Sequence, residues 1–471
     1  MDFSELCYSS ASDLRKRLLA KEISCLEVIQ AHIARIEQVN EAVNAIVTFI
    51  PEQALEQAKR ADEQLAKQDS VGLLHGLPVA HKDLAHTKGI RTTEGSPLFK
   101  DFVPEQDDLI IERIKAAGAI TVGKTNTPEF GAGSQTFNEV FGATKNPYHL
   151  SKTCGGSSGG SAVALATGMV PLADGSDMGG SLRNPAAFCN VVGFRTTPGL
   201  VPDYPSSRGW NTFSVVGPMA RTVEDSALFL AAIAGHDDRV PISRSDDSKQ
   251  FLSSLETDLK AKRIAWALDF AGLPFDKRVT ETLEPLAKTF TELGCTVEAA
   301  QPDFSEADYV FKTYRAYSFA ASHHERLKTQ RDKLKDTVIW NAEEGLKLTA
   351  LDLAKAEEAR TRLFVRVAEF MKSYDYLILP VTQVPPFDVT QPYVKEIAGV
   401  QMETYIDWMK SCYYISTIGN PAISVPGGFT AEGLPIGLQI VGRYGHDLEV
   451  LQLAHAFEQA TKVGQKRPSL S

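Results

Sequence analysis

The apolar residues near the start of the chain recur at the spacing of an amphipathic helix. Ser24 and Glu27 stand three positions apart, as in a capping box. The residues that follow place one apolar stripe on a helix: Leu26, Ile29, Ile33 and Ile36. Pro51 begins a second segment of this kind, with Ala54, Ala58, Ala61 and Leu65 along one face. Residues 1–70 are therefore predicted to form a helical segment.

From about residue 76 onward, short apolar runs alternate with helical stretches. Strands are predicted at residues 119–122, 263–268, 296–299, 376–380, 422–425 and 437–441. Helices are predicted at residues 108–117, 162–168 and 279–293, over most of 308–372, and at 447–461. This alternation, without a linker or an internal repeat, favours one large α/β domain with helices on both faces of a sheet. We therefore expect a single domain, 1–471, with the helical segment 1–70 packed on it.

Composition narrows the classes of partner. The 471 residues are 43% hydrophobic and 23% charged, and the net charge of −10 disfavours nucleic acid and anionic membranes as partners. The first residues lack the features of a signal peptide, and no run approaches the ~18 apolar residues of a membrane span. Six scattered cysteines indicate reduced thiols, so the cytoplasm is the expected location. His81 and His86 lack neighbouring ligands that would complete a metal site, so no metal is expected.

Two serine-bearing glycine clusters are the strongest chemical signal. They are residues 155–161 (GGSSGGS) and 177–181 (DMGGS), and Ser157 and Ser181 lie 24 positions apart. Glycine has no Cβ, so the backbone N–H groups of such a segment can approach a substrate closely. Lys82 follows a short apolar run, and a lysine that burial has deprotonated can activate a serine. These residues predict acyl transfer without a histidine base; the alternatives are tight packing at the glycines and a surface charge at Lys82.

Two other motifs in the chain suggest different chemistry. Residues 118–125 match the phosphate-binding P-loop, but strand-like residues lie between its two glycines and a proline follows where a helix is required. Residues 156–160 match the nucleophile elbow of α/β-hydrolases, with Ser158 as the nucleophile. The elbow requires a strand directly before it, and residues 146–152 are predicted to form a loop. Both interpretations are therefore disfavoured.

Residues 155–199 closely resemble the signature segment of the amidase signature family. The blocks 76–83, 122–130, 213–225 and 419–442 are also similar to segments of that family, and the resemblance covers roughly residues 10–460. It implies a three-layer α/β/α fold with a large mixed sheet and a signature core at about 76–225. It also implies an amidohydrolase that uses no cofactor and cleaves a carboxylic amide to an acid and an amine.

The resemblance also implies a role for each matching residue. Ser181 would be the nucleophile, Ser157 the serine that follows a cis peptide bond and relays the proton, and Lys82 the base. The oxyanion hole would consist of the backbone N–H groups of Met178, Gly179, Gly180 and Ser181. Supporting positions would be Ser158 and Asp177, with Arg183 as a structural ion-pair partner. Many members have threonine at the position of Met178, so the surface beside the nucleophile is larger and more apolar here.

The substrate is specified less closely than the reaction. A small-molecule amide, apolar or aryl, is expected, and the resemblance allows carbamates and esters. The candidate residues for an apolar pocket are Phe137, Tyr204, Trp210 and Phe213, for which plain core packing is the alternative. One rival function is the glutaminase subunit of a tRNA-dependent amidotransferase, although residues 301–372 resemble stand-alone bacterial amidases. A second is an inactive binding relative, and the complete triad argues against it. We expect a monomer or a homodimer.

Overall fold

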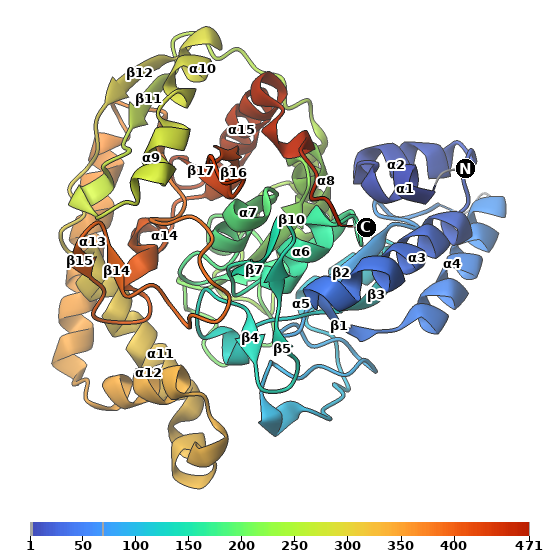
Figure 1. The fold of residues 1–471 in the computed structure, drawn as a ribbon, viewed down its shortest axis with the longest axis horizontal. Coiled ribbons are helices and arrows are strands. Elements are labelled where there is room, and N and C mark those ends of the chain that lie inside the picture. Colours follow the sequence, from blue (N-terminus) through green and yellow to red (C-terminus); the bar gives the residue numbers. More distant parts are fainter. Residues whose placement is uncertain (1–2, 68–69, 471) are drawn as a thin grey trace.

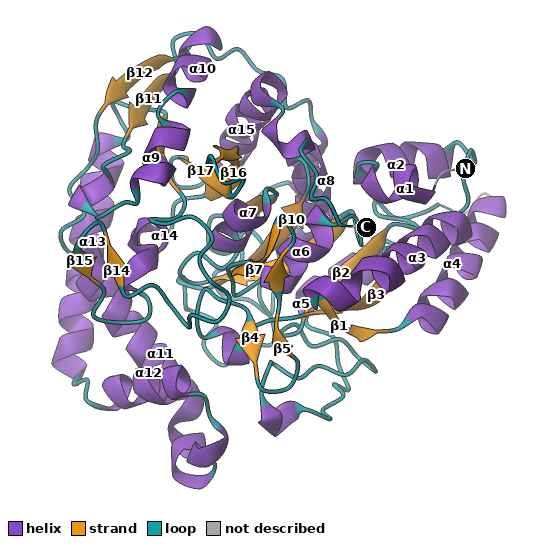
Figure 2. Ribbon diagram, in the orientation of Figure 1, coloured by secondary structure: helices purple, strands orange, loops and turns teal. Residues whose placement is uncertain are grey.

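The computed structural model describes residues 3–67 and 70–470, and its centre is an 11-stranded sheet (Figures 1 and 2). The strand order is β1-β3-β2-β8-β10-β9-β16-β17-β13-β11-β12. Their bounds are β1 Ile46–Phe49, β2 Pro78–Lys82, β3 Ile120–Thr125, β8 Leu172–Asp177, β9 Val192–Arg195, β10 Val215–Ala220, β11 Arg263–Trp266, β12 Thr296–Ala299, β13 Tyr376–Pro380, β16 Ala422–Phe429 and β17 Pro435–Val441. β2 is parallel to β3 and β8, and β11 is parallel to β12 and β13, whereas the other pairs are antiparallel. The sheet is therefore mixed, as predicted.

Helices cover both faces of this sheet (Figures 1 and 2). In chain order they are α1 Phe3–Tyr8, α2 Ala11–Leu19, α3 Cys25–Val43, α4 Pro51–Ala66, α5 Leu109–Ala116, α6 Gly159–Ala166, α7 Arg183–Cys189, α8 Val223–Ile233, α9 Lys277–Leu283, α10 Leu286–Glu292, α11 Ala307–Thr329, α12 Asp336–Leu346, α13 Ala350–Phe370, α14 Lys410–Ile418 and α15 Asp447–Thr461. Three small hairpins lie outside the main sheet: β4 Phe137–Asn138 with β5 Gly142–Ala143, β6 Lys145–Asn146 with β7 His149–Thr153, and β14 Glu396–Ile397 with β15 Val400–Gln401.

The N-terminal segment is helical except for one strand. Ser24 and Glu27 form the predicted capping box at the start of α3, and Pro51 begins α4. Residues 46–49, which we included in the helical segment, instead form β1 and pair antiparallel with β3. Asn44 ends α3 in the left-handed conformation, and the β-branched residues that follow it favour a strand. The N-terminal segment thus supplies an edge strand of the central sheet.

Two further predictions need correction. The helix predicted at 279–293 is divided into α9 and α10 at Pro285, which has no N–H group to continue a helix. Residues 146–152, predicted to form a loop, include most of β7 in the β6–β7 hairpin. That hairpin lies outside the central sheet, so it does not provide the strand of a nucleophile elbow. The P-loop interpretation is excluded, because β3 continues through Gly123, Lys124 and Thr125.

Helix α7 lies unusually close to the sheet because glycines underlie it. A Cβ atom on Gly193 of β9 would lie 2.3 Å from the backbone oxygen of Leu182, and one on Gly437 of β17 would lie 2.5 Å from the Cβ of Ala187. Gly217 of β10 also faces Leu182. The glycines of three strands therefore allow α7, which begins two residues after Ser181, to pack directly on the sheet backbone.

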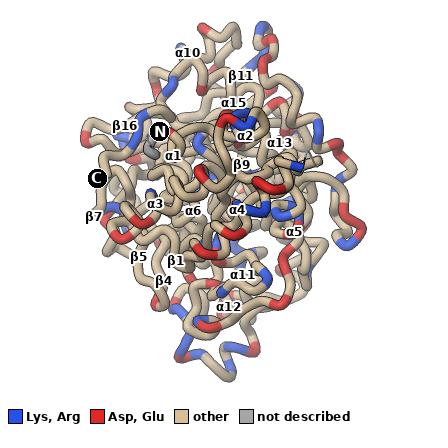
Figure 3. Tube along the Cα trace, turned by 90° about the vertical axis from the view of Figure 1, so that its right-hand side faces the viewer, with Lys and Arg blue, Asp and Glu red and all other residues tan. Residues whose placement is uncertain are grey.

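Charged residues of both signs are distributed along the chain (Figure 3). Acidic and basic residues are interspersed over the side of the molecule that Figure 3 shows. In the described ranges 3–67 and 70–470, no helix has both the length and the apolar composition needed to cross a membrane.

Candidate active site

Lys82 lies at the end of β2, deep in the central sheet. Every position of this strand is buried because β2 lies between β3 and β8, and Lys82 is 1% exposed. Its Nζ atom donates hydrogen bonds to Oγ of Ser157 at 2.7 Å and to Oγ of Ser176 at 3.0 Å. Its backbone N–H donates to Oδ1 of Asp174 at 2.9 Å. The strand therefore directs the lysine amine toward two hydroxyl groups.

The environment of Lys82 favours its neutral form. Burial lowers the pKa of its ammonium group to about 7, while the nearby carboxylates of Asp177 and Asp174 oppose this shift. Near pH 7 a large fraction of the side chain is then an uncharged amine that can accept a proton.

The first glycine cluster places Ser157 beside this amine. Ser157 follows a cis peptide bond with Gly156 and is 2% exposed. Helix α6 begins two residues later, so the predicted helix starts earlier than residue 162. A Cβ atom on Gly160 would lie 2.3 Å from the backbone nitrogen of Asn126. Glycine is required there because α6 packs directly on the chain that leaves β3, and this packing fixes the position of Ser157.

Ser181 lies in the turn between β8 and α7 and is partly exposed. Its backbone oxygen accepts a hydrogen bond from the N–H of Ser158 at 3.2 Å, which joins the two glycine clusters. The carboxylate of Asp177 organises the turn: Oδ1 accepts from the N–H of Gly180 at 2.8 Å and Oδ2 from the N–H of Leu182 at 3.2 Å. Asp177 and Ser158, predicted as supporting residues, therefore contact the segment that carries Ser181.

Asp177 also forms the centre of a buried charge cluster. Arg183 contacts both of its carboxylate oxygens at 3.0 Å, and Arg195 contacts Oδ1 at 3.2 Å and the backbone oxygen of Asp177. All three side chains are fully buried. Burial alone would raise the pKa of the Asp177 carboxyl, but the two guanidinium groups hold it well below its usual range. The predicted ion pair of Arg183 is present, and Arg195 extends it.

The four predicted oxyanion-hole residues differ in their surroundings. The N–H of Gly180 is already bonded to Asp177. Gly179 faces the ring of Phe311 and the Cβ of Tyr413: a Cβ atom on the glycine would lie 2.7 Å from Cζ of Phe311 and 3.4 Å from Cβ of Tyr413. The side chain of Met178 is partly buried and lies 3.8 Å (Sδ) from Nη1 of Arg315. Helices α11 and α14 therefore cover this part of the turn.

The predicted pocket residues do not form one group. Phe213 is buried and stacks on Tyr314 with ring centroids 4.6 Å apart, and its ring centroid is 6.4 Å from that of Phe311. It thus lies one layer behind the ring that faces Gly179. The other three candidates have different neighbours: Tyr204 lies under Arg239, Phe137 lies under Lys335, and Trp210 is 78% exposed.

Several residues at the site were not identified from the sequence. Ser176 is the second acceptor for Lys82. It directly precedes the second glycine cluster, 177–181, and this position was an available signal. Phe311, Arg315 and Tyr413 come from helices more than 120 positions further along the chain. No local spacing connects them to the glycine clusters.

The two histidines considered as metal ligands have separate partners. His81 lies between Oδ2 of Asp174 at 2.5 Å and Oγ1 of Thr121 at 3.0 Å. His86 contacts Oε1 of Glu94 at 3.1 Å. Within residues 3–67 and 70–470, no three His, Cys, Asp or Glu side chains are arranged to hold a metal ion.

Known proteins match nearly the whole chain. A model of the Amidase family matches residues 27–451. The acylamidase of Rhodococcus erythropolis is 33% identical over 472 residues, which cover 100% of this chain and 99% of that protein. One subunit of the glutamyl-tRNA(Gln) amidotransferase of Geobacillus kaustophilus (strain HTA426) is 35% identical over 495 residues, which cover 98% of this chain and 99% of that protein.

A solved structure agrees with the sequence comparisons. A bacterial aryl acylamidase of the amidase signature enzymes superposes with a TM-score of 0.91 at 28% identity, over 97% of each chain. The 11-stranded mixed sheet is therefore the fold of these enzymes.

Proposed function

Because this chain belongs to the Amidase family and hydrolyses amide C–N bonds, we propose that it does so with Ser181, Ser157 and Lys82 as a catalytic triad. The observation that carries this assignment is the 2.7 Å contact between Nζ of the buried Lys82 and Oγ of Ser157. The residue after Ser157, Ser158, donates its backbone N–H to the backbone oxygen of Ser181. A base, a relay and a nucleophile can thus act in sequence.

The proposed reaction has two halves. Neutral Lys82 accepts a proton from Ser157 as Ser157 takes the proton of Ser181, and Oγ of Ser181 attacks the amide carbonyl carbon. The tetrahedral intermediate collapses with cleavage of the C–N bond, and the proton returns through Ser157 to the leaving amine. A water molecule then transfers its proton along the same relay and attacks the ester of Ser181, which releases the acid.

Backbone N–H groups stabilise the oxyanion in this proposal. Met178, Gly179 and Ser181 supply the donors, while Gly180 keeps the turn in shape through its bond to Asp177. Since these donors belong to the backbone, the methionine at 178 leaves the oxyanion hole intact. Its side chain instead shapes the surface next to the acyl group.

We propose small amides with an apolar or aryl group as substrates, with carbamates and esters as secondary ones. The ring of Phe311, which lies against Gly179 and stacks on Tyr413, supports this choice, since it makes the packing behind the oxyanion hole apolar. An acylamidase and an aryl acylamidase among the similar proteins also support it. The expected partner is thus a small molecule, without nucleic acid, membrane or cofactor. The chain would act in the cytoplasm as a single domain, either as a monomer or as a homodimer.

The experiment is a panel of anilides, aliphatic amides, carbamates and esters assayed with the wild type and two variants. Ser181→Ala and Lys82→Met should each reduce kcat by a factor of about 10⁴ or more on an acyl-p-nitroanilide, because units of a triad fail together. A Ser158→Ala control tests the elbow alternative and should retain most of the activity. Turnover like that of the wild type in Ser181→Ala would refute the mechanism. If the activity of both preparations came from a contaminating enzyme, the chain itself would be inactive, as the binding-relative alternative predicts.

The amidotransferase alternative is supported by the 35% identity to one subunit of that enzyme, which is similar to the 33% identity to the acylamidase. It predicts a stoichiometric partner chain and ammonia release from glutamine. Affinity purification from the native host, followed by a glutaminase assay of the eluate, distinguishes the two functions. A partner chain together with glutamine hydrolysis would overturn our choice, and anilide hydrolysis by the isolated chain would support it.

A further inference from the structure

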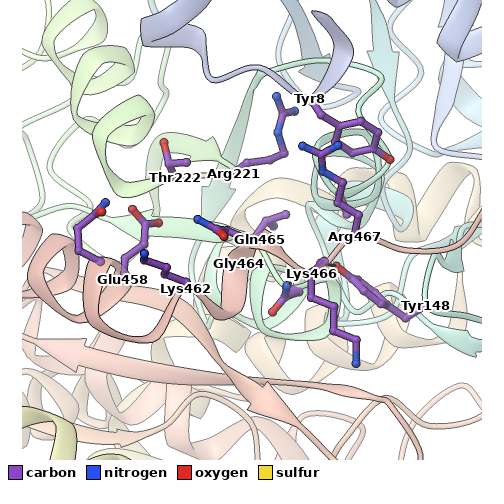
Figure 4. A pocket seen from close by; sticks show the side chains of 14 residues that line it. Tyr8, Tyr148, Arg221, Thr222, Glu458, Lys462, Gly464, Gln465, Lys466 and Arg467 are labelled. Carbon is purple, nitrogen blue, oxygen red and sulfur yellow. Dashed lines mark hydrogen bonds between the residues drawn. The ribbon is translucent and has the colours of Figure 1, made fainter. Parts of the chain in front are cut away.

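A cavity of about 410 Å³ lies away from the proposed triad (Figure 4). It is open to solvent and is lined by residues of the end of α1, the β6–β7 hairpin, the ends of α6 and β10, α15 and the C-terminal residues after α15. β10 is antiparallel to β8, and Ala220 at its end pairs with Leu172 at the start of β8. Arg221, which lines the cavity, follows Ala220, whereas Ser181 follows the other end of β8. The cavity and the active site therefore lie at opposite ends of these strands.

Cationic side chains line this cavity: Arg221, Lys462, Lys466 and Arg467 (Figure 4). In the part of the chain that the structure describes, none of them forms an ion pair with a carboxylate. Arg221 instead donates to the backbone oxygens of Val170 at 2.8 Å and Ser9 at 2.6 Å. Among the described residues these charges thus have no carboxylate at ion-pair distance, although Asp225 is near enough to raise the pKa of Arg221.

The ring of Tyr8 holds two of these cations near each other. Cζ of Arg467 lies 4.1 Å from the ring centroid, and Cζ of Arg221 lies 5.9 Å from it. Both distances permit cation–π attraction. Burial lowers the pKa of Arg221, and the charge of Arg467 lowers it further, although Asp225 opposes both. The fold therefore keeps two like charges together beside the cavity.

The carboxyl that lines the cavity does little to offset this charge. Glu458 accepts a hydrogen bond from the N–H of Val223 at 3.0 Å. Burial raises the pKa of Glu458 to about 8 despite this bond, and the neighbouring acids Asp225 and Glu224 contribute to the increase. The lining has four cationic side chains and this single carboxyl, so it carries a net positive charge whether or not Glu458 is ionised.

Asn190 also lines the cavity and offers a hydrogen-bond acceptor. It is 3% exposed, and its Nδ2 donates to the backbone oxygens of Val463 and Lys466, both at 3.2 Å. Its Oδ1 is buried and has no hydrogen-bond partner among the described residues. A buried acceptor left unpaired destabilises the folded state. A ligand with a hydrogen-bond donor would remove this cost.

We propose that the cavity binds the phosphate monoester of a small polyhydroxy compound. The phosphate lies against Lys462 and Arg467, while Nζ of Lys466 stays over the ring of Phe429 at 3.8 Å, and a hydroxyl of the ligand donates to Oδ1 of Asn190. Several uncompensated cations suit a doubly charged phosphate better than a single carboxylate. The volume equals that of on the order of a dozen water molecules, which leaves room for an organic body beyond the phosphate. Binding here does not depend on the proposed triad.

Titration calorimetry on the full chain at low salt tests this proposal with three probes. Ribose 5-phosphate should bind with one site per chain, inorganic phosphate at least about tenfold more weakly, and ribose without measurable heat. The double variant Lys462→Met/Arg467→Met should lose at least about tenfold in affinity for ribose 5-phosphate. Both side chains are exposed, so the fold should survive their replacement. Lys288→Met is the matched control, since that lysine is 82% exposed elsewhere on the surface, and its affinity should not change.

Three further variants test the charge beside the ligand, the hydrogen bond to Asn190 and the independence of binding from catalysis. Asn190→Asp places a second anion beside the ligand and should weaken binding more than Asn190→Ser does. Ser181→Ala should bind ribose 5-phosphate like the wild type, so this test does not depend on the proposed hydrolysis. The proposal is overturned if the wild type does not bind ribose 5-phosphate at millimolar concentration. It is also overturned if the double variant binds equally well, or if inorganic phosphate binds as tightly as ribose 5-phosphate.

Discussion

Nζ of Lys82 lies 2.7 Å from Oγ of Ser157, although 75 positions separate the two residues in the chain. The contact is made by two elements that the sheet brings together. β2 ends at Lys82 beside β8, and α6, which follows Ser157, packs on β2 and β8. The nucleophile candidate Ser181 follows β8 itself. One region of the sheet thus positions a buried amine and both serines.

The pH dependence of the reaction should report the titration of Lys82. The base must be neutral, and the pKa of Lys82 is about 7. We expect kcat/KM for an anilide to fall about tenfold per pH unit below that value and to level off above it. Rates measured between about pH 5 and about pH 9 test this. An acid limb centred near pH 4, typical of a carboxylate base, would contradict the assignment.

Lys82→Met should abolish activity and yet stabilise the fold. The folded-state pKa of Lys82 lies below its unfolded value, so the charged lysine opposes folding fully below about pH 7, and this penalty disappears as the pH rises toward about 10.4. The full penalty is roughly 5 kcal/mol. The increase in Tm over the wild type should therefore be larger at about pH 6 than at about pH 9. Lys288→Met, at an exposed site, should show no such difference.

The two hydroxyl groups that accept from Lys82 should contribute unequally. Ser157→Ala removes the proposed relay and should reduce kcat/KM by a factor of about 10⁴, as for the other members of the triad. Ser176→Ala removes one orienting hydrogen bond, worth about 1 kcal/mol, and should cost less than about tenfold. Steady-state kinetics on one anilide compare the two variants. An equal loss in both would mean that Ser176 belongs to the relay.

Asp177→Asn should destabilise the protein strongly. The change leaves the buried guanidinium groups of Arg183 and Arg195 without their carboxylate, which typically costs about 3–5 kcal/mol. Because the pKa of Asp177 is depressed in the folded state, its contribution is complete above about pH 4 and declines as the pH falls below that value. Denaturant unfolding measures the change. Asp238→Asn, whose side chain is fully exposed, should have little effect.

The sequence predicted many of the local elements and the residues that we propose for the chemistry, but it predicted neither the strands β2, β8, β9 and β10 nor the partners that tertiary packing supplies. Strand β12 and helix α15 match their predicted bounds because the spacing of their apolar residues is regular and the residues on either side interrupt that spacing. β1 was missed because four residues after a helix carry little periodic signal. The glycine clusters pointed to Ser157 and Ser181, whereas Phe311 reaches Gly179 from a distant helix that no spacing rule connects to it.

The side chain at position 178 should control the preference for the acyl group without changing the chemistry. Met178 contributes a backbone N–H to the proposed oxyanion hole, and its side chain extends to Arg315, where Sδ lies 3.8 Å from Nη1. Met178→Thr shortens the side chain and enlarges the adjacent space, so kcat/KM for a bulky aryl-acyl anilide should rise relative to that for acetanilide. Met178→Leu keeps the size and apolarity and is the matched control, which should preserve the ratio. Each pocket methylene is worth about 1 kcal/mol, so a shift of about fivefold or more in the ratio is expected. An unchanged ratio in Met178→Thr would mean that the acyl group binds on the other side of the turn, away from α11.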